Sequence, residues 1–349
     1  MNILIDTRYL EQQNTGIAVG LKAFLMELEE IIDLKKFKIY LLYQREKKFH
    51  SDSFEYIQTD TKLFSIKEHL EFYKIFKRYN IDIFYSHHFI SPIFKKNVKV
   101  INIIHDLIPY KVDVLSPLGK LYYKIMNSIT MKYSDVIAAN SYATKNDIKD
   151  IFKRKDIKVI YHSYNRNKLN IFDDNILDKL NLQGDSYFLF VSSLKKHKNY
   201  KRVIEAFKQF NNDKNYKLIL VGKDNQNISN DEILFTGYVS DEELNSLYRN
   251  ASALIFPSLI EGFGVPILEA QYHKCPIITS NISSMPEVAG KGALFVNPLK
   301  AEEIIKAFST VLDTDTRKEL IINGVENLNR FNWKQYTKEM INIFEELKK

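Results

Sequence analysis

Short apolar runs alternate with amphipathic, helix-like stretches from one end of the chain to the other. This alternation is typical of βαβ units, in which parallel strands form a sheet and helices cover its faces. We predict strands at residues 3–6, 38–42, 81–86, 98–105, 136–139 and 157–161, with helices at 17–32 and 118–132. Beyond residue 165 we predict strands at 187–192, 216–221, 233–236, 253–256 and 276–280, with helices at 200–210, 241–250 and 300–312. The chain is therefore expected to be an α/β protein with two doubly wound sheets.

A polar stretch at residues 162–170 separates the two series of strands. We interpret it as a linker between a first domain, residues 1–165, and a second domain, residues 166–328. Open parallel sheets bind ligands at the carboxyl ends of their strands, and ligand sites often lie between domains. The predicted site is accordingly a cleft between the two domains.

Composition limits the class of protein. The chain has 349 residues, of which 45% are hydrophobic and 27% charged, which is typical of a globular protein with room for two domains. No apolar run approaches the ~18–20 residues of a membrane span. Asp6 and Arg8 place charges where a signal peptide needs an apolar segment. A single cysteine, Cys275, excludes an internal disulfide and a cysteine-rich metal site, so we predict a cytoplasmic protein.

The chain is basic, with a formal net charge of +7. Lysine and arginine form clusters at residues 35–38, 45–48, 95–96 and 195–196. One interpretation is attraction to an anionic membrane surface or to an anionic lipid-linked acceptor. The other is a solvated surface in a lysine-rich protein. Nucleic acid is not an expected partner, because no recognised binding module accompanies the charge.

Two glutamates, Glu261 and Glu269, enclose a Gly-Phe-Gly loop and Pro266. Proline suits the first turn of a helix, so Glu261 is expected in the loop before the helix and Glu269 about one turn inside it. Gly262 and Gly264 let the backbone approach a ligand closely. The helix N-terminus offers unpaired N–H groups to a phosphate, and the two carboxylates can accept hydrogen bonds from hydroxyls. A sugar nucleotide presents that combination of groups.

Lys198 follows the predicted strand 187–192 and precedes the helix 200–210. A lysine at the carboxyl edge of a parallel strand can reach a phosphate bound at the neighbouring helix N-terminus. The alternative is a lysine on a solvated face.

The sequence Glu261-Gly-Phe-Gly-Val-Pro-Ile-Leu-Glu269 resembles the E-x7-E motif of the retaining glycosyltransferases of family 4, which have the GT-B fold. The resemblance covers nearly the whole chain and is strongest over residues 187–298. It implies two Rossmann-like, doubly wound domains facing across a cleft. The first would be the acceptor side and the second the donor side. Residues 329–349, which include the family's F-x-W pattern as Phe331-Asn-Trp333, would form a helix that crosses back to the first domain.

The resemblance also implies roles for individual residues. Lys198 would stabilise the departing diphosphate, and Glu269 would hold the ribose. Glu261 would orient the sugar hydroxyls. The rest of the implied donor site consists of Gly16, Gly262, Phe263, Gly264 and Val265. No metal or other cofactor is expected, because protein groups supply the positive charge, and no enzyme nucleophile is evident.

Two motifs in the first half also resemble the family. His105-Asp-Leu-Ile-Pro109 is similar to its H-D-L-x-P signature, which implies that His105 contacts the transferred sugar. A purely structural histidine is the alternative, and Asp106 can equally be a turn residue. Asn14-Thr-Gly16-Ile is similar to a T-G-I-G-R-Y loop, but the second glycine and the Arg-Tyr pair are missing. For this loop, the resemblance therefore implies only a hydrogen bond donated by the backbone N–H of Gly16.

The loop before Lys198, which resembles the family's phosphate-binding loop, also departs from the family pattern. A second acidic motif lies further along the chain. Ser192 replaces a usual glycine and Ser193 a frequent basic residue, so the second positive charge is assigned to Lys195, Lys196 or His197. Residues 313–315 read Asp-Thr-Asp, the D-x-D metal motif of another glycosyltransferase fold, but they follow a helix near the end of the chain. We predict a turn there.

Together these features predict a retaining transferase that moves a hexose from a nucleotide-sugar to a glycan or lipid-linked oligosaccharide in surface polysaccharide synthesis. The motifs most resemble enzymes that use GDP-mannose, although related enzymes use UDP-glucose, UDP-N-acetylglucosamine or dTDP-rhamnose. Two alternatives remain open. One is another GT-B enzyme, such as a nucleotide-sugar epimerase or a phosphorylase. The other is a catalytically degenerate nucleotide-sugar binding subunit.

Overall fold

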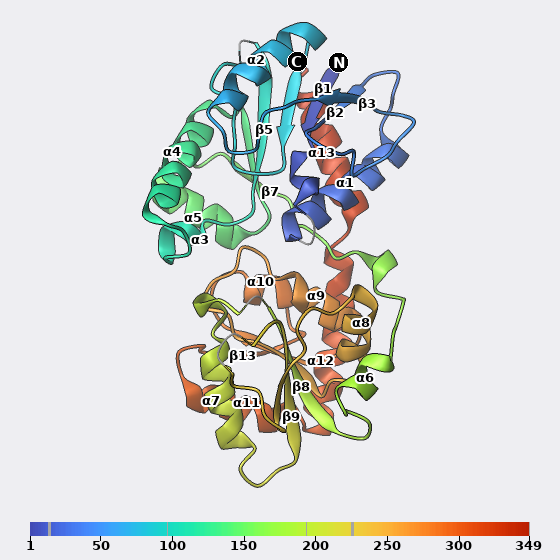
Figure 1. The fold of residues 1–349 in the computed structure, drawn as a ribbon, viewed down its shortest axis with the longest axis vertical. Coiled ribbons are helices and arrows are strands. Elements are labelled where there is room, and N and C mark those ends of the chain that lie inside the picture. Colours follow the sequence, from blue (N-terminus) through green and yellow to red (C-terminus); the bar gives the residue numbers. More distant parts are fainter. Residues whose placement is uncertain (13–14, 96, 193, 225–226, 349) are drawn as a thin grey trace. The chain divides into compact units, whose positions relative to one another are not determined.

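The structure is a computed structural model that describes residues 1–12, 15–95, 97–192, 194–224 and 227–348. The chain forms two compact units (Figure 1). The first comprises Met1–Ser163 and Asn332–Lys349, and the second comprises Tyr164–Phe331. The two boundaries, after Ser163 and after Phe331, lie within a few residues of the boundaries that we predict after residues 165 and 328.

The first unit is built on a seven-stranded parallel sheet. Its strands are β1 (Asn2–Asp6), β2 (Lys38–Tyr43), β3 (Glu55–Gln58), β4 (Ile83–Ser86), β5 (Lys99–Ile104), β6 (Val136–Ala139) and β7 (Ile157–Val159). The order across the sheet is β3-β2-β1-β4-β5-β6-β7. Ile3 pairs with Ile39 on one side and with Ile83 on the other, so β1 is buried at the centre of the sheet.

Helices cover both faces of this sheet. They are α1 (Gly16–Ile31), α2 (Lys67–Tyr79), α3 (Ile108–Lys111), α4 (Pro117–Tyr133), α5 (Tyr142–Phe152) and α13 (Trp333–Glu346), with a 3-10 helix η1 at Arg8–Glu11. On one face α1 packs against α13, where Phe24 contacts the ring of Tyr336. On the other face Phe72 of α2 packs against Phe84 of β4. Residues from the end of the chain therefore complete the core of the first unit.

The second unit is built on a six-stranded parallel sheet, ordered β10-β9-β8-β11-β12-β13. Its strands are β8 (Ser186–Val191), β9 (Tyr216–Val221), β10 (Ile233–Phe235), β11 (Ala253–Phe256), β12 (Ile277–Ser280) and β13 (Leu294–Val296). The helices are α6 (Asn175–Lys179), α7 (Tyr200–Phe210), α8 (Asp241–Asn250), α9 (Val265–Tyr272), α10 (Met285–Ala289), α11 (Ala301–Thr310) and α12 (Thr314–Asn327). Three 3-10 helices complete it: η2 (Arg166–Lys168), η3 (Lys196–Lys198) and η4 (Leu328–Arg330).

The predicted α/β architecture is confirmed, and the predicted strands agree with the observed ones to within two residues at each end. No helix in the described parts of the chain has the length and apolar character that a membrane span requires. Ser240 caps α8 and forms a capping box with Glu243. Sequence patterns missed the short edge strands β3 and β13. The predicted turn at Asp313-Thr-Asp315 is wrong, because Asp313 is the N-cap of α12 and accepts a hydrogen bond from Thr316 N at 2.9 Å.

Candidate functional site

The strand order places a topological switch point between β8 and β11 in the second sheet. The chain runs outward from β8 through β9 to β10, and from β11 through β12 to β13 in the opposite direction. The loops after β8 and β11 therefore diverge, which is where open α/β sheets bind ligands. Lys198 lies on the first of these loops and Glu261 on the second.

The structure brings Lys198 and Glu261 together. Lys198 Nζ donates to Glu261 Oε1 at 2.6 Å, and the two side chains are only 14% and 9% exposed. The ammonium group also lies 5.9 Å from the centre of the Phe256 ring at the end of β11. An ion pair shielded from water in this way fixes both charged groups at the carboxyl edge of the sheet.

Asn199 links the two loops behind this ion pair. Its side-chain amide donates to the carbonyl oxygens of Pro257, at 3.1 Å, and Pro298, at 2.7 Å. Asn199 has a positive φ of 65°, which asparagine tolerates better than most residues. The adjacent His197 is buried, and this burial together with nearby Lys198 and Lys195 lowers the pKa of His197 to about 4. His197 is therefore neutral at pH 7, so it cannot supply the second positive charge that the sequence assigned to one of three residues.

Two serines hold the loop that carries Glu261. Ser284 Oγ lies 3.1 Å from the carbonyl oxygen of Glu261 and 2.8 Å from that of Phe263. Ser283 Oγ accepts a hydrogen bond from Glu261 N at 3.1 Å and lies 2.8 Å from the Glu261 carbonyl. The structure shows that both hydroxyls position the loop.

Gly264 makes the sharp entry into α9. It is the N-cap, with φ of 108°, and an added Cβ would lie 3.3 Å from Ile267 Cδ1 and 3.6 Å from Phe256 Cε1. A side chain there would meet both backbone strain and crowding. Pro266 lies in the first turn, as predicted, and Val265 begins the helix. Helix starts leave N–H groups without intrahelical acceptors, so this end of α9 can bind an anion.

Glu269 lies one turn into α9 and is half-buried. The Tyr248 hydroxyl donates to its Oε2 at 3.0 Å. Burial raises the pKa of the Glu269 carboxyl to about 7 despite this hydrogen bond. Tyr248 was not identified from the sequence, because an aromatic residue within an amphipathic helix is usually interpreted as part of the hydrophobic core.

Replacing Glu269 by glutamine is expected to stabilise the second unit at pH 8. The carboxyl has a higher pKa in the folded protein than its ordinary 4.5, so its contribution to stability is complete below pH 4.5 and is lost as the pH rises through 7. The neutral amide avoids that loss, so we expect a gain of about 2 kcal/mol in the free energy of unfolding at pH 8 and little change at pH 4.5. Urea unfolding at the two pH values measures this. An equal effect at both pH values would contradict it.

His105 lies at the carboxyl end of β5 in the first unit. Its Nε2 lies 2.7 Å from the carbonyl oxygen of His87, so Nε2 is the protonated nitrogen. The rings of His87, His105 and His162 pack together, and one nitrogen from each lies within 4.8 Å of the others. Burial lowers the pKa of His105 to about 4. At neutral pH it is an uncharged imidazole with a fixed tautomer. Among the residues that the structure describes, this trio is the group best placed to hold a metal ion.

The other two motifs of the first half have simple local structures. Asp106 Oδ1 accepts a hydrogen bond from Ile108 N at 2.9 Å at the start of α3, as a turn residue does. Gly16 begins α1, and Thr15 caps that helix by accepting from Ala18 N at 3.2 Å. Among the described residues, no atom lies within 4 Å of a Cβ placed on Gly16, so these neighbours do not require glycine. Asn14 of this loop and Ser193 of the phosphate loop lie outside the described residues.

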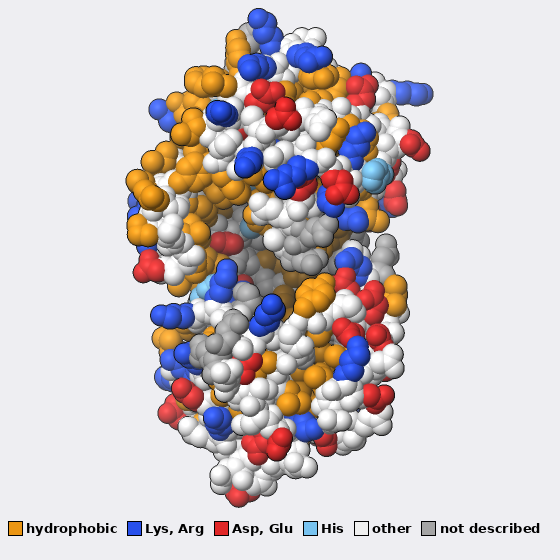
Figure 2. All heavy atoms as spheres, viewed as in Figure 1, with side chains coloured by type: hydrophobic (Ala, Val, Ile, Leu, Met, Phe, Trp, Pro, Cys, Tyr) orange, Lys and Arg blue, Asp and Glu red, His pale blue; other side chains and the backbone are white. Residues whose placement is uncertain are grey.

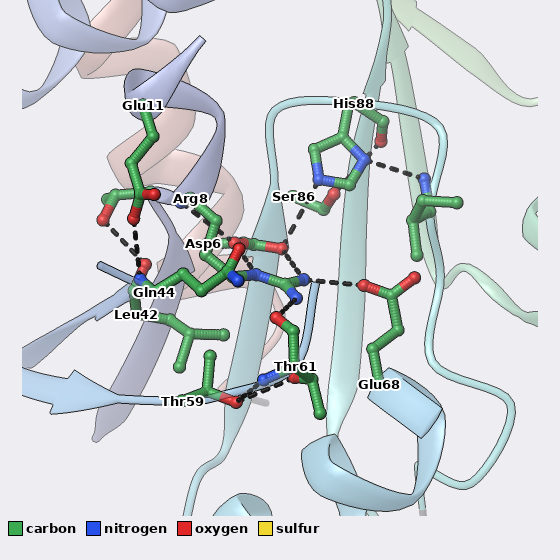
Figure 3. Close-up of polar contacts among 12 residues, drawn as sticks. Asp6, Arg8, Glu11, Leu42, Gln44, Thr59, Thr61, Glu68, Ser86 and His88 are labelled. Atoms are coloured by element: carbon green, nitrogen blue, oxygen red, sulfur yellow. Dashed lines mark hydrogen bonds and ion pairs between the residues drawn. The ribbon is translucent and has the colours of Figure 1, made fainter. Parts of the chain in front are cut away.

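A buried charge network occupies the switch point of the first sheet, where β1 and β4 are neighbours (Figure 3). Arg8 donates to Asp6 Oδ2 at 2.6 Å and to Glu68 Oε2 at 2.9 Å, and all three side chains are inaccessible to solvent. Burial alone would raise the pKa of Asp6, but Arg8 and His88 hold it well below its ordinary value. Burial raises the pKa of Glu68 to about 7. This network was not predicted from the sequence, because Glu68 is distant from Arg8 along the chain.

Both halves of the chain match known protein families. The family described as Glycosyltransferase Family 4 matches residues 42–168, and that described as Glycosyl transferases group 1 matches residues 172–327. The O-antigen chain mannosyltransferase RfbU of Salmonella typhimurium is 31% identical over 226 residues, which are 61% of this chain and 60% of that protein. The chain spans 48% and 60% of the length of the first two curated relatives that it matches.

Solved structures confirm the fold. The sucrose-phosphate synthase from Thermosynechococcus elongatus has a TM-score of 0.78 at 18% identity, with 99% of each chain covered. Anabaena HepE in complex with UDP-glucose has a TM-score of 0.73 at 16% identity, with 99% of this chain and 100% of that one covered. The predicted fold of two Rossmann-like domains, GT-B, is therefore confirmed. Two successive glycosyltransferase matches, family 4 over residues 42–168 and group 1 over residues 172–327, thus extend over most of this fold.

Proposed function

We propose that this protein transfers a hexose from a nucleotide-sugar donor to a glycan or lipid-linked acceptor in surface polysaccharide synthesis. The observation that carries the proposal is the ion pair at the switch point of the second sheet, which joins Lys198 on the loop after β8 to Glu261 on the loop that leads into α9. A positive side chain, a helix N-terminus and two carboxylates match the diphosphate, sugar and ribose of a nucleotide-sugar.

Each group has a proposed task. Lys198 and the N-terminal amides of α9 at Gly264 and Val265 stabilise the negative charge that develops on the departing diphosphate. Glu261, held by Ser283 and Ser284, accepts hydrogen bonds from the sugar hydroxyls. Glu269 accepts hydrogen bonds from the ribose, beside the hydroxyl of Tyr248. Gly262 and Phe263, which lie between Glu261 and the helix, complete the donor loop.

His105 is proposed to contact the transferred sugar, as its motif implies. Its Nε2 proton is engaged by the carbonyl oxygen of His87, and its low pKa keeps the ring neutral. The neutral ring thus leaves its Nδ1 lone pair as an acceptor for a sugar hydroxyl.

The proposed transfer retains the anomeric configuration and needs no metal. Lys198 and the helix amides supply positive charge at the diphosphate, which is the task that a metal ion performs in other transferases. The acceptor would attack from the face that the leaving group occupies. The expected rate of transfer is the same with and without a chelator of divalent cations.

The proposed donor is GDP-mannose. The support comes from the motifs and from relatives named as O-antigen mannosyltransferases. HepE, which shares the fold, was solved with UDP-glucose, so a UDP-sugar is the competing donor. Calorimetric titration with GDP, UDP, GDP-mannose and UDP-glucose distinguishes these. Tighter binding of the GDP compounds is expected, and a preference for UDP compounds would overturn the assignment of the base.

Removing the hydroxyl of Ser284 is expected to lower transfer without abolishing donor binding. In Ser284→Ala the carbonyl oxygens of Glu261 and Phe263 lose their shared donor, so the loop that positions Glu261 gains freedom. We expect the turnover number to fall roughly tenfold, which corresponds to about 1.4 kcal/mol in the barrier, while the dissociation constant for the nucleotide changes little. Ser309→Ala, on α11, is the matched control. Wild-type turnover in Ser284→Ala would show that the serine has no positioning role.

A further inference from the structure

Three histidines of the first unit meet at the carboxyl edge of its sheet. His87 follows β4, His105 follows β5 and His162 follows β7, so three separate loops bring them together. One ring nitrogen of each histidine lies within 4.8 Å of those of the other two. The rings of His87 and His162 are stacked with their centroids 5.4 Å apart, and the ring of His105 stands edge-on to both. We call these three residues the histidine trio.

His87 has a buried nitrogen that forms no hydrogen bond with the described residues. The side chain is inaccessible to solvent, and Nε2 is the nitrogen without a partner. The other nitrogen, Nδ1, lies 2.6 Å from the Tyr85 hydroxyl, which lies 3.0 Å from the Tyr336 hydroxyl. When Tyr85 donates its proton to Tyr336, it accepts one from Nδ1 of His87, and Nε2 then carries a lone pair. Buried polar atoms normally have partners, so this lone pair is suited to a ligand.

Gly20, inside helix α1, leaves space beside this nitrogen. A Cβ built on Gly20 would lie 3.4 Å from His87 Nε2, 3.6 Å from His162 Cε1 and 3.2 Å from Trp333 Cη2. Glycine weakens the interior of a helix, so its presence here has a packing reason rather than a conformational one. The absent side chain leaves room for about one methyl group next to the edges of two rings of the trio.

The protonation of the trio suits a metal ion. His105 Nε2 donates to the carbonyl oxygen of His87 at 2.7 Å, which leaves Nδ1 of His105 as the nitrogen with a lone pair. Metal-binding histidines commonly donate their other N–H in this way. Burial, together with the neighbouring His105, lowers the pKa of His87 and of His162 well below the ordinary 6.5. All three rings are therefore neutral at pH 7, which is the form that binds a metal ion.

We propose that the histidine trio binds a divalent transition-metal ion, zinc above all, through Nε2 of His87, Nδ1 of His105 and one ring nitrogen of His162. Imidazole is a good ligand for zinc, cobalt, nickel and copper, whereas magnesium and calcium prefer oxygen. Two nitrogens on one tetrahedral zinc ion lie about 3.4 Å apart, so the rings have to approach by about 1.4 Å at most. His105 is the partly exposed member, so the ion enters from its side and the fourth position stays open.

Bound metal would compete with the proposed reaction. The ion occupies Nδ1 of His105, which the proposed function assigns to a hydroxyl of the transferred sugar. Added zinc is therefore expected to inhibit transfer, and a chelator should restore the rate of the metal-free protein. This consequence rests on the proposed function, whereas the binding of metal does not.

The surface offers little competition for such an ion. Of the eight histidines, all of which the structure describes, only His50 is exposed. Histidine covers little of the face shown in Figure 2, where the basic side chains are mostly lysine and arginine. These side chains are protonated at neutral pH and bind no metal ion. Binding of one ion per chain can therefore be attributed to the buried trio.

Calorimetric titration of the full chain, without a histidine tag, with Zn²⁺ alone tests the site. We expect one ion per chain with a dissociation constant on the order of micromolar, and no heat with Mg²⁺. His162→Phe keeps a ring in the stack without its nitrogens, and His105→Gln removes the partly exposed ligand. Each should raise the dissociation constant at least tenfold. His50→Gln, which removes the exposed histidine, is the matched control and should bind Zn²⁺ like the unmodified protein.

Titration of the unmodified protein with Co²⁺ gives a second result that needs no folded variant. Cobalt held tetrahedrally by nitrogen absorbs visible light more strongly than the hydrated ion, so absorption should rise to one equivalent and disappear when Zn²⁺ displaces the cobalt. Absence of both this absorption and the heat of Zn²⁺ binding would overturn the proposal. So would equal Zn²⁺ affinity in folded His162→Phe and His105→Gln. Neither titration contains a nucleotide-sugar, so zinc that binds without slowing transfer would contradict the sugar contact of His105 and not the metal site.

Discussion

Substitution of Lys198 by methionine is expected to reduce sugar transfer at least a hundredfold. The ammonium group lies at the switch point of the second sheet and is fixed by Glu261 at 2.6 Å, so it needs no rearrangement to meet charge that develops on the diphosphate. Removing one fixed group of this kind typically costs about 2.7–4 kcal/mol in the barrier. The measurement is the release of nucleotide in the presence of acceptor. Lys201→Met, an exposed lysine at the start of α7, is the control and should retain full activity.

The partner of Lys198 provides the second part of this test. Glu261→Gln should also lower transfer at least tenfold, because it changes an acceptor for sugar hydroxyls and releases Lys198 from its ion pair. Since the two side chains are in direct contact, the losses in the double variant should fall well short of additivity. Transfer at the wild-type rate in either single variant would exclude the proposed site.

Substitution of Arg8 by methionine is expected to destabilise the first unit by about 3–5 kcal/mol at pH 8. Arg8 is fully buried and its guanidinium neutralises Asp6 and Glu68, so its removal leaves two carboxyl groups inside the protein without that cation (Figure 3). The free energy of unfolding from urea titration is the measurement. Arg45→Met, which removes an exposed arginine, should change it by less than about 0.5 kcal/mol.

The destabilisation by Arg8→Met should depend on pH. Glu68 has a pKa raised to about 7 even with Arg8 present, so its carboxyl is protonated in the folded protein at pH 5. Stability linked to a raised pKa is complete below the ordinary value near 4.5 and is lost as the pH rises through 7. The loss caused by the substitution should thus be smaller at pH 5 than at pH 8. An equal loss at both pH values would mean that Arg8 contributes packing rather than charge.

The sequence predicted the fold well because the signals for it are local. Buried parallel strands such as β8 and β11 are almost continuous apolar runs, and Ser240 with Glu243 marks the start of α8. The edge strand β3 was missed because its polar, exposed ends lack that apolar signature, and the edge strand β13 was missed because its apolar run is only three residues long.

The donor loop was predictable for the same reason, whereas its supports were not. Glu261, Gly264 and Pro266 are close in sequence and carry a specific pattern, but the hydrogen bond that holds the Glu261 backbone comes from Ser284, which approaches only in the folded chain. The pairing of Lys198 with Glu261 likewise spans 63 residues of sequence and depends on β8 and β11 being neighbours. Strand order is a property of the fold as a whole, and a single sequence does not encode it in any local pattern.

The most direct test of the central claim is a measurement of nucleotide release from GDP-mannose by the purified protein, with and without a lipid-linked oligosaccharide acceptor. We predict release of GDP that depends on acceptor, proceeds equally in the presence of a chelator, accompanies transfer of mannose in the anomeric configuration of the donor, and is lost in Lys198→Met. Binding of the nucleotide-sugar without acceptor-dependent release from any donor, or release that Lys198→Met leaves unchanged, would contradict the proposed function.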